Sequence, residues 1–133
     1  MRVVDIDHLV LTVSSIEKTV DFYERALGMR AEVFGPERRT ALLFGSHKIN
    51  LHQIDRTFEP KAGHPIPGSA DLCLLVDSLD RAEETLKACN VDVLVARSAR
   101  TGARGRLTSI YIRDPDLNLI ELSVYQGDTK ATA

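Results

Sequence analysis

The fold is decided by Asp7-His8-Leu9-Val10-Leu11-Thr12-Val13, because the chain contains a second version of this stretch, Ala70-Asp71-Leu72-Cys73-Leu74-Leu75-Val76. In this alignment His8 falls on Asp71, 63 residues later. Both stretches are short and rich in branched apolar residues, as β-strands are. The fixed offset indicates an internal repeat.

An amphipathic helix is expected after each of these strands. Apolar residues recur with helical spacing at Ile16, Val20, Tyr23 and Leu27, and again at Leu79, Ala82, Leu86 and Cys89. Ser14 followed by Glu17 has the spacing of a capping box, which marks the start of the first helix. Three strand candidates follow each helix, at 30–34, 40–44 and 49–54 and then at 91–96, 108–113 and 119–125. The chain therefore reads as two βαβββ modules.

These modules predict a single domain over residues 1–133. Module 1–58 and module 69–126 are joined by a linker at 59–68, which holds three of the five prolines. A lone module would leave a sheet edge and one sheet face uncovered, so we expect the two to pack, within one chain or across a homodimer. The predicted class is α+β, with the two modules forming a cupped mixed sheet.

Composition narrows the classes of partner. The formal charge of -2 gives no general attraction to polyanions, so nucleic acid is not an expected partner. No apolar run approaches the roughly 20 residues that span a bilayer, so a membrane is not expected either. Charged residues near the N-terminus argue against a signal peptide. A cytoplasmic location is therefore predicted, with Cys73 and Cys89 as free thiols.

Four potential metal ligands fall at two pairs of repeated positions. His8 and Asp71 lead the first strand of each module, and we match His52 with Glu121 in the last strands, 69 residues apart. Imidazole and carboxylate groups bind zinc, nickel, manganese, cobalt or iron, and the set does not select among these metals. Glu121 stands among apolar neighbours, where a charge needs a partner or a metal. Asp71 could be a ligand or could hydrogen-bond a ligand histidine.

Four arginines, Arg97, Arg100, Arg104 and Arg106, fall in what the pattern predicts to be one long connection between strands. Guanidinium groups in such a connection could hold a carboxylate or phosphate of a substrate. Arg104 and Arg106, together with Tyr111, are the candidate substrate-binding residues. The alternative is a solvated basic segment that balances the acidic second helix.

The sequence resembles the vicinal oxygen chelate superfamily of glyoxalases, extradiol dioxygenases and bleomycin-resistance proteins. The resemblance is carried by residues 6–13, by Phe22-Tyr23 with Leu27-Gly28-Met29, and by 114–121. Residues 48–52 and 67–73 look like a narrower subgroup of stand-alone glyoxalase-domain proteins. The resemblance implies metal ligands on the first and last strands of each module, matching His8, His52, Asp71 and Glu121. Glyoxalase I typically has a glutamate in place of His52 and a histidine in place of Asp71.

In these relatives a Lewis-acidic metal stabilises the oxyanion that develops on a substrate with adjacent oxygens. We therefore expect a metal-dependent lyase or isomerase for an α-oxo-carbonyl compound or its thiol adduct, with Glu121 as base and Asp71 able to share that task. One alternative is an extradiol-type dioxygenase, which would need ferrous iron and oxygen. The other is a non-catalytic protein that binds a drug or metabolite.

Overall fold

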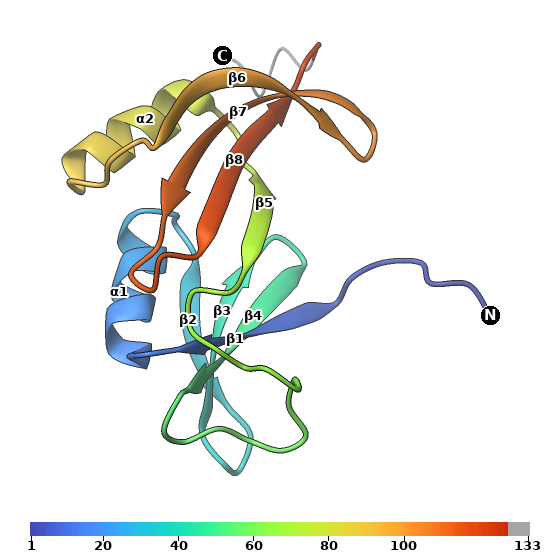
Figure 1. Cartoon of the computed structure of the whole chain (residues 1–133), viewed down its shortest axis with the longest axis vertical. Helices are drawn as coiled ribbons and strands as arrows, with labels where there is room; N and C mark the ends of the chain where they lie inside the picture. Colours follow the sequence, from blue (N-terminus) through green and yellow to red (C-terminus); the bar gives the residue numbers. More distant parts are fainter. Residues whose placement is uncertain (128–133) are drawn as a thin grey trace. The chain divides into compact units, whose positions relative to one another are not determined.

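The computed structural model describes residues 1–127, which form two compact units. Unit 1 is Met1–Ser69, and unit 2 begins at Ala70. Each contains one helix and one four-stranded sheet, in the order βαβββ (Figure 1). This repetition confirms the predicted α+β fold with two tandem modules.

Unit 1 comprises β1 (His8–Val13), α1 (Ile16–Arg25), β2 (Arg30–Phe34), β3 (Arg39–Phe44) and β4 (His47–Gln53). The strand order is β1-β4-β3-β2, with β1 parallel to β4 and the other pairs antiparallel. The N-cap of α1 is Ser15, whose side chain accepts a hydrogen bond from Lys18 N. The helix therefore begins one residue later than a cap at Ser14 would place it.

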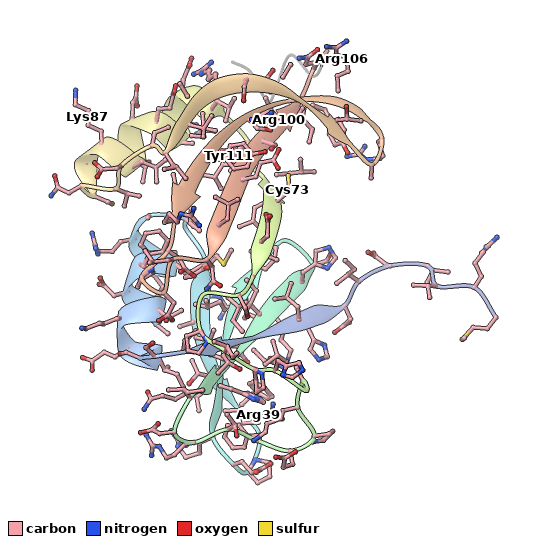
Figure 2. All side chains as sticks on the ribbon, in the orientation of Figure 1. Arg39, Cys73, Lys87, Arg100, Arg106 and Tyr111 are labelled. Carbon is pink, nitrogen blue, oxygen red and sulfur yellow. The ribbon has the colours of Figure 1, made fainter. Side chains whose placement is uncertain are left out.

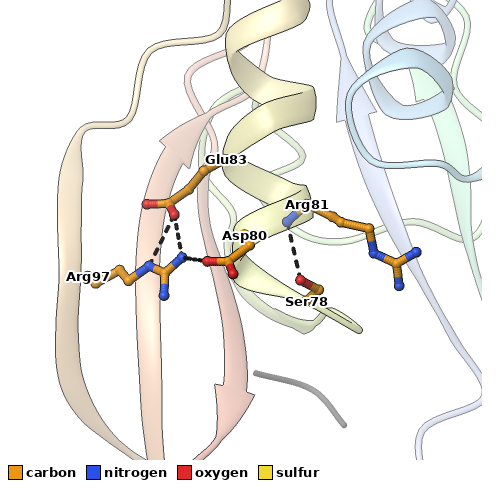
Figure 3. Close-up of polar contacts among 5 residues, drawn as sticks. All are labelled: Ser78, Asp80, Arg81, Glu83 and Arg97. Atoms are coloured by element: carbon orange, nitrogen blue, oxygen red, sulfur yellow. Dashed lines mark hydrogen bonds and ion pairs between the residues drawn. The ribbon is translucent and has the colours of Figure 1, made fainter. Parts of the chain in front are cut away.

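Unit 2 comprises β5 (Asp71–Leu75), α2 (Leu79–Ala88), β6 (Val95–Gly102), β7 (Gly105–Arg113) and β8 (Leu119–Tyr125). Its order, β5-β8-β7-β6, repeats that of unit 1. Ser78 caps α2 by accepting a hydrogen bond from Arg81 N (Figure 3). Each described helix has ten residues, and neither is long and apolar enough to cross a membrane.

The arginine-rich segment, predicted as a long connection, is a β-hairpin. β6 runs to Gly102 and β7 begins at Gly105, so the two strands pair almost to the turn. The strand predicted at 91–96 is found four residues later, at 95–102. Pairing with β7 satisfies the backbone hydrogen bonds of this mostly polar stretch, whose composition is not typical of a strand. Arg97, on β6, hydrogen-bonds Asp80 and Glu83 of α2 (Figure 3).

Each unit has its own core between its sheet and its helix. The most buried side chains of unit 1 include Val13, Tyr23, Leu42, Ile49 and Leu51, and those of unit 2 include Leu79, Leu86, Ile110, Ile112, Ile120 and Leu122. Because side chains alternate along a strand, the residues between these lie on the opposite face of each sheet. We call this face the polar face. It carries Asn50 and His52 in unit 1, and Ser109, Tyr111, Glu121 and Ser123 in unit 2.

Candidate functional site

Glu121 is the centre of a hydrogen-bonded cluster on the polar face of unit 2. It lies on β8 between Cys73 of β5 and Tyr111 of β7. Ser109 Oγ donates to Glu121 Oε2 at 2.6 Å, and Ser123 Oγ donates to the same oxygen at 3.3 Å. Both serines are fully buried. Two buried hydroxyl groups thus fix the Oε2 atom of a carboxylate that is itself partly exposed.

Tyr111 and Arg100 lie beside this carboxylate. Burial raises the pKa of Tyr111, and a hydrogen bond between its hydroxyl and Glu121 raises it further. The Arg100 guanidinium lies 5.2 Å from the centroid of the Tyr111 ring. Figure 2 shows Arg100 and Tyr111 close together in unit 2, with Cys73 nearby. Of the predicted substrate-binding residues, Tyr111 therefore lies at the cluster.

Arg104 and Arg106 are not brought to this cluster. Arg104 lies in the turn between β6 and β7, where its guanidinium is 4.3 Å from the centroid of the Tyr125 ring. Its backbone N–H donates to the Tyr125 hydroxyl at 3.1 Å. Arg106 lies opposite Thr101, and alternation along β7 puts its side chain on the other face from Tyr111. Arg100, one of the four arginines named from the sequence but not chosen as a candidate, lies beside Tyr111 instead.

Cys73 also faces the cluster. Its Sγ lies 3.3 Å from Ser123 Oγ. Burial raises the pKa of the Cys73 thiol, outweighing the lowering by the Ser123 hydrogen bond. The thiol is therefore held in its protonated, less nucleophilic form.

His8 of unit 1 is oriented by its neighbour. Asp7 Oδ1 lies 2.8 Å from His8 Nδ1, and this hydrogen bond lowers the pKa of Asp7. A carboxylate at Nδ1 favours the tautomer with the proton there, which leaves the Nε2 lone pair available. The His8 side chain is 44% exposed, so that lone pair has access to a ligand.

Unlike that of His8, the Nε2 atom of His52 is engaged in a hydrogen bond. Arg39 Nη2 lies 2.9 Å from His52 Nε2, and because a guanidinium only donates, Nε2 must accept. Burial lowers the pKa of His52, and the positive charge of Arg39 lowers it further. His52 is therefore neutral, and the lone pair that would bind a metal is engaged by Arg39.

The predicted match of His52 with Glu121 is wrong by two residues. Glu121 lies opposite Cys73, and Cys73 repeats Val10, which lies opposite Asn50. Asn50 is therefore the counterpart of Glu121, and His52 that of Ser123. A shift of two residues leaves a side chain on the same face of the sheet, so alternation could not reveal the error.

The same register separates His8 from His52. His8 lies opposite Lys48, and His52 is four residues further along β4. Four residues of strand span about 13 Å. Asn50 lies between them, 5% exposed, and its Oδ1 is buried without a hydrogen-bond partner. An unpaired buried amide oxygen is costly, so this atom is suited to a ligand.

Each unit carries groups whose chemistry suits a divalent metal. Unit 1 has the His8 imidazole and the unpaired Asn50 oxygen, and unit 2 has the Glu121 carboxylate and Asp71 at the exposed start of β5. These are nitrogen and oxygen ligands of the kind that zinc, nickel or manganese accept. Within residues 1–127, no three His, Cys, Asp or Glu side chains form a group that could hold a metal ion.

Known proteins resemble the chain closely. It is 53% identical over 122 residues to virulence protein STM3117 of Salmonella typhimurium, covering 90% of this chain and 83% of that protein. It is 52% identical over 127 residues to the glyoxalase domain-containing protein RDO1 of Mycosarcoma maydis, covering 95% and 71%.

Solved structures agree with this likeness. The crystal structure of STM3117 matches with a TM-score of 0.91, covering 94% of this chain and 99% of that chain. The integron cassette protein VCH_CASS1 of V. cholerae matches with a TM-score of 0.92 and 50% identity, covering 95% and 98%. The family that matches residues 5–122 is described as the glyoxalase, bleomycin resistance protein and dioxygenase superfamily. The chain belongs to this superfamily.

Proposed function

We propose that the chain is a metal-dependent lyase or isomerase that acts on a small substrate with adjacent oxygens, an α-oxo-carbonyl compound or its thiol adduct. The observation that carries the proposal is the Glu121 carboxylate, held by Ser109 and Ser123 on the polar face of unit 2. Neutral hydroxyls fix a partly buried carboxylate without neutralising its charge, and a nearby cation would stabilise it. This suits a metal ligand, and an anionic carboxylate can also act as a base.

His8, Asp71 and Glu121 are the proposed metal ligands, with the Asn50 oxygen at the position that the repeat makes equivalent to Glu121. His52 was predicted as a ligand from the sequence, but its contact with Arg39 disfavours that role. We therefore propose that His52 accepts a hydrogen bond from Arg39 and holds its guanidinium in place, and does not bind the metal. The metal remains one of zinc, nickel, manganese, cobalt or iron.

When bound, the metal supplies Lewis acidity that stabilises an oxyanion on the substrate. Glu121 removes the proton beside the substrate carbonyl, and Ser109 and Ser123 hold the carboxylate in position during that transfer. Tyr111, whose raised pKa keeps its hydroxyl protonated, serves as a hydrogen-bond donor beside Glu121. Asp71, the second carboxylate of the proposed set, can share the role of base. The cytoplasmic location and the homodimer belong to the same proposal.

The test is metal content by mass spectrometry on untagged protein, for wild type and for His8→Ala, Asn50→Ala, His52→Ala, Asp71→Ala and Glu121→Ala. One metal per chain is expected in wild type, lost in the His8, Asp71 and Glu121 variants and weakened in Asn50→Ala. If His52→Ala keeps the metal, this supports the proposal that His52 positions Arg39 and is not a metal ligand. His64→Ala, in the linker, is the matched control and should keep the metal.

Activity is then screened with α-oxo-aldehydes, with and without a thiol, under each metal and without oxygen. Turnover in the absence of oxygen supports the lyase or isomerase. Oxygen consumption with catechols and bound iron would instead identify a dioxygenase. A wild-type protein that binds no divalent metal after reconstitution would overturn the proposal in favour of a non-catalytic binding protein.

A further inference from the structure

Unit 1 contains a pocket of about 670 Å³ in which positive charge predominates. It is formed by the start of α1, the turn between β2 and β3, and the segment that follows β4. Its charged lining residues are Glu17, Glu37, Arg38, Arg39 and Arg56. Three guanidinium groups against two carboxylates leave a net positive charge. The lining includes none of the proposed metal ligands.

Arg39 is fixed in this pocket by contacts that leave its charge unneutralised. Its Nη2 donates to the neutral His52, and its Cζ lies 4.6 Å from the centroid of the Phe58 ring. The Phe34 ring is also within reach, at 5.8 Å. Aromatic rings and a neutral imidazole hold a guanidinium in place without supplying a negative charge. Arg39 is thus a rigid, half-buried cation.

None of the three pocket arginines forms an ion pair within the described part of the chain. The ion pairs there involve other cations, and none joins Arg38, Arg39 or Arg56 to a carboxylate. The Nε of Arg39 is also buried without an acceptor. A partly desolvated cation with an unmatched N–H group is costly, and an anion in the pocket would offset that cost.

Neutral donors line the same pocket. Thr40 and Thr57 contribute hydroxyl groups. Lys61 Nζ donates to Thr57 Oγ1 at 3.0 Å, which brings a further cation near the pocket, although Glu59 also pairs with it. Gln53 is already engaged, because its Oε1 accepts from Ile16 N and its Nε2 donates to Asp55. Hydroxyl and guanidinium donors together form an environment suited to oxyanions.

We propose that this pocket binds the oxyanion group of a small ligand, a carboxylate or a phosphate, with Arg39 as its anchor and Arg38 and Arg56 at its rim. The planar guanidinium fork matches both groups. The pocket shares no lining residue with the proposed metal ligands, so anion binding can be tested on protein without metal. A failure of one proposal leaves the other standing.

The test is a titration of metal-free, ¹⁵N-labelled protein with sodium acetate or sodium phosphate, at ionic strength held constant with sodium chloride. Saturable shifts are expected at the Thr40 and Thr57 amides and at the Arg39 Nε–H signal. Saturation by acetate alone identifies a carboxylate site, and saturation by phosphate alone a phosphate site. Tetramethylammonium chloride is the cationic control and should shift none of these signals.

Arg39→Gln should weaken anion binding roughly tenfold or more, since it removes a charged donor. Arg56→Gln replaces an exposed side chain that cannot disturb the core, and should weaken binding severalfold even if the Arg39 variant folds poorly. Arg30→Gln, on β2 and exposed, is the matched control and should leave binding unchanged. The proposal is overturned if neither anion gives saturable shifts, if both pocket variants bind like wild type, or if only the cation binds.

Discussion

Ser109 and Glu121 lie on neighbouring strands, and the buried hydroxyl of Ser109 donates to Glu121 Oε2 at 2.6 Å. The residue directly opposite Glu121 is Tyr111, and Ser109 lies opposite Ser123, so this bond runs diagonally between the two strands. Hydrogen bonds to an ionised acceptor are shorter and stronger than neutral ones. The sheet itself therefore sets the direction in which the other carboxylate oxygen, Oε1, points.

Ser109→Ala should lower metal affinity about 10- to 100-fold, as losses of outer partners of metal ligands typically do. The fold should persist, because alanine fits the same space. Competition with a chromophoric chelator measures the affinity. Ser98→Ala is the control, since Ser98 lies opposite Ser109 and its buried Oγ has no partner. Equal affinities in the two variants would contradict the role assigned to Ser109.

Stability should fall as the pH drops below about 6.5, because of His52. Burial lowers its pKa in the folded protein from the ordinary 6.5, so the unfolded chain takes up the proton first. The contribution of neutral His52 is thus complete above that pH and is lost progressively below it. Urea unfolding of wild type at a series of pH values should show this slope. His52→Gln should flatten it, and the exposed His64→Gln should not.

Gly102→Ala should destabilise unit 2 by about 1–3 kcal/mol, the usual cost of overpacking. A Cβ at Gly102 would lie 2.8 Å from Leu107 Cδ1 and 3.0 Å from the Tyr125 hydroxyl. Leu107 is only 3% exposed, so it has little room to move. Gly63→Ala, where an added Cβ meets nothing within 4 Å, should stay within about 0.5 kcal/mol of wild type. Denaturant unfolding compares the two.

Arg97→Ala should cost at most about 1 kcal/mol, although Arg97 ties β6 to α2 through Asp80 and Glu83. The side chain is 40% exposed, so solvent screens both ion pairs. The loss should shrink at high salt. Arg81→Ala breaks only a local pair with Asp77, which directly precedes the N-cap of α2, and should cost less. Unfolding free energies at low and high salt measure both effects, and a larger, salt-independent loss at Arg97 would contradict this account.

Most of the fold could be predicted from the sequence, because the apolar periodicities of both modules reflect their cores. Ile49 and Leu51 alternate as a strand with one buried face should, and both are fully buried. The C-terminal part of β6 could not be predicted in this way. Its residues 97–102 are mostly polar, and they form a strand only because β7 pairs with them.

The site could be predicted only in part. Glu121 was recognisable as a charge among apolar neighbours, but its partner Ser109 is brought to it by the pairing of β7 and β8, which the sequence alone does not reveal. Arg100 was named among the four arginines of its segment but was not chosen from them, because the segment was taken as a loop, where alternation has no meaning. The pocket around Arg39 was missed because its lining residues come from separate segments of unit 1, and no local pattern joins them.

The corrected register places two hydrogen-bonded pairs at the same positions of the repeat. Thr40 lies opposite Leu51, so Arg39 lies opposite His52, and their counterparts in unit 2 are Ser109 and Ser123. One pair is cationic and the other is neutral, yet the strands that carry them pair alike. A repeat built in this way can evolve a new ligand preference by exchanging two side chains in one copy, while the other copy conserves its chemistry.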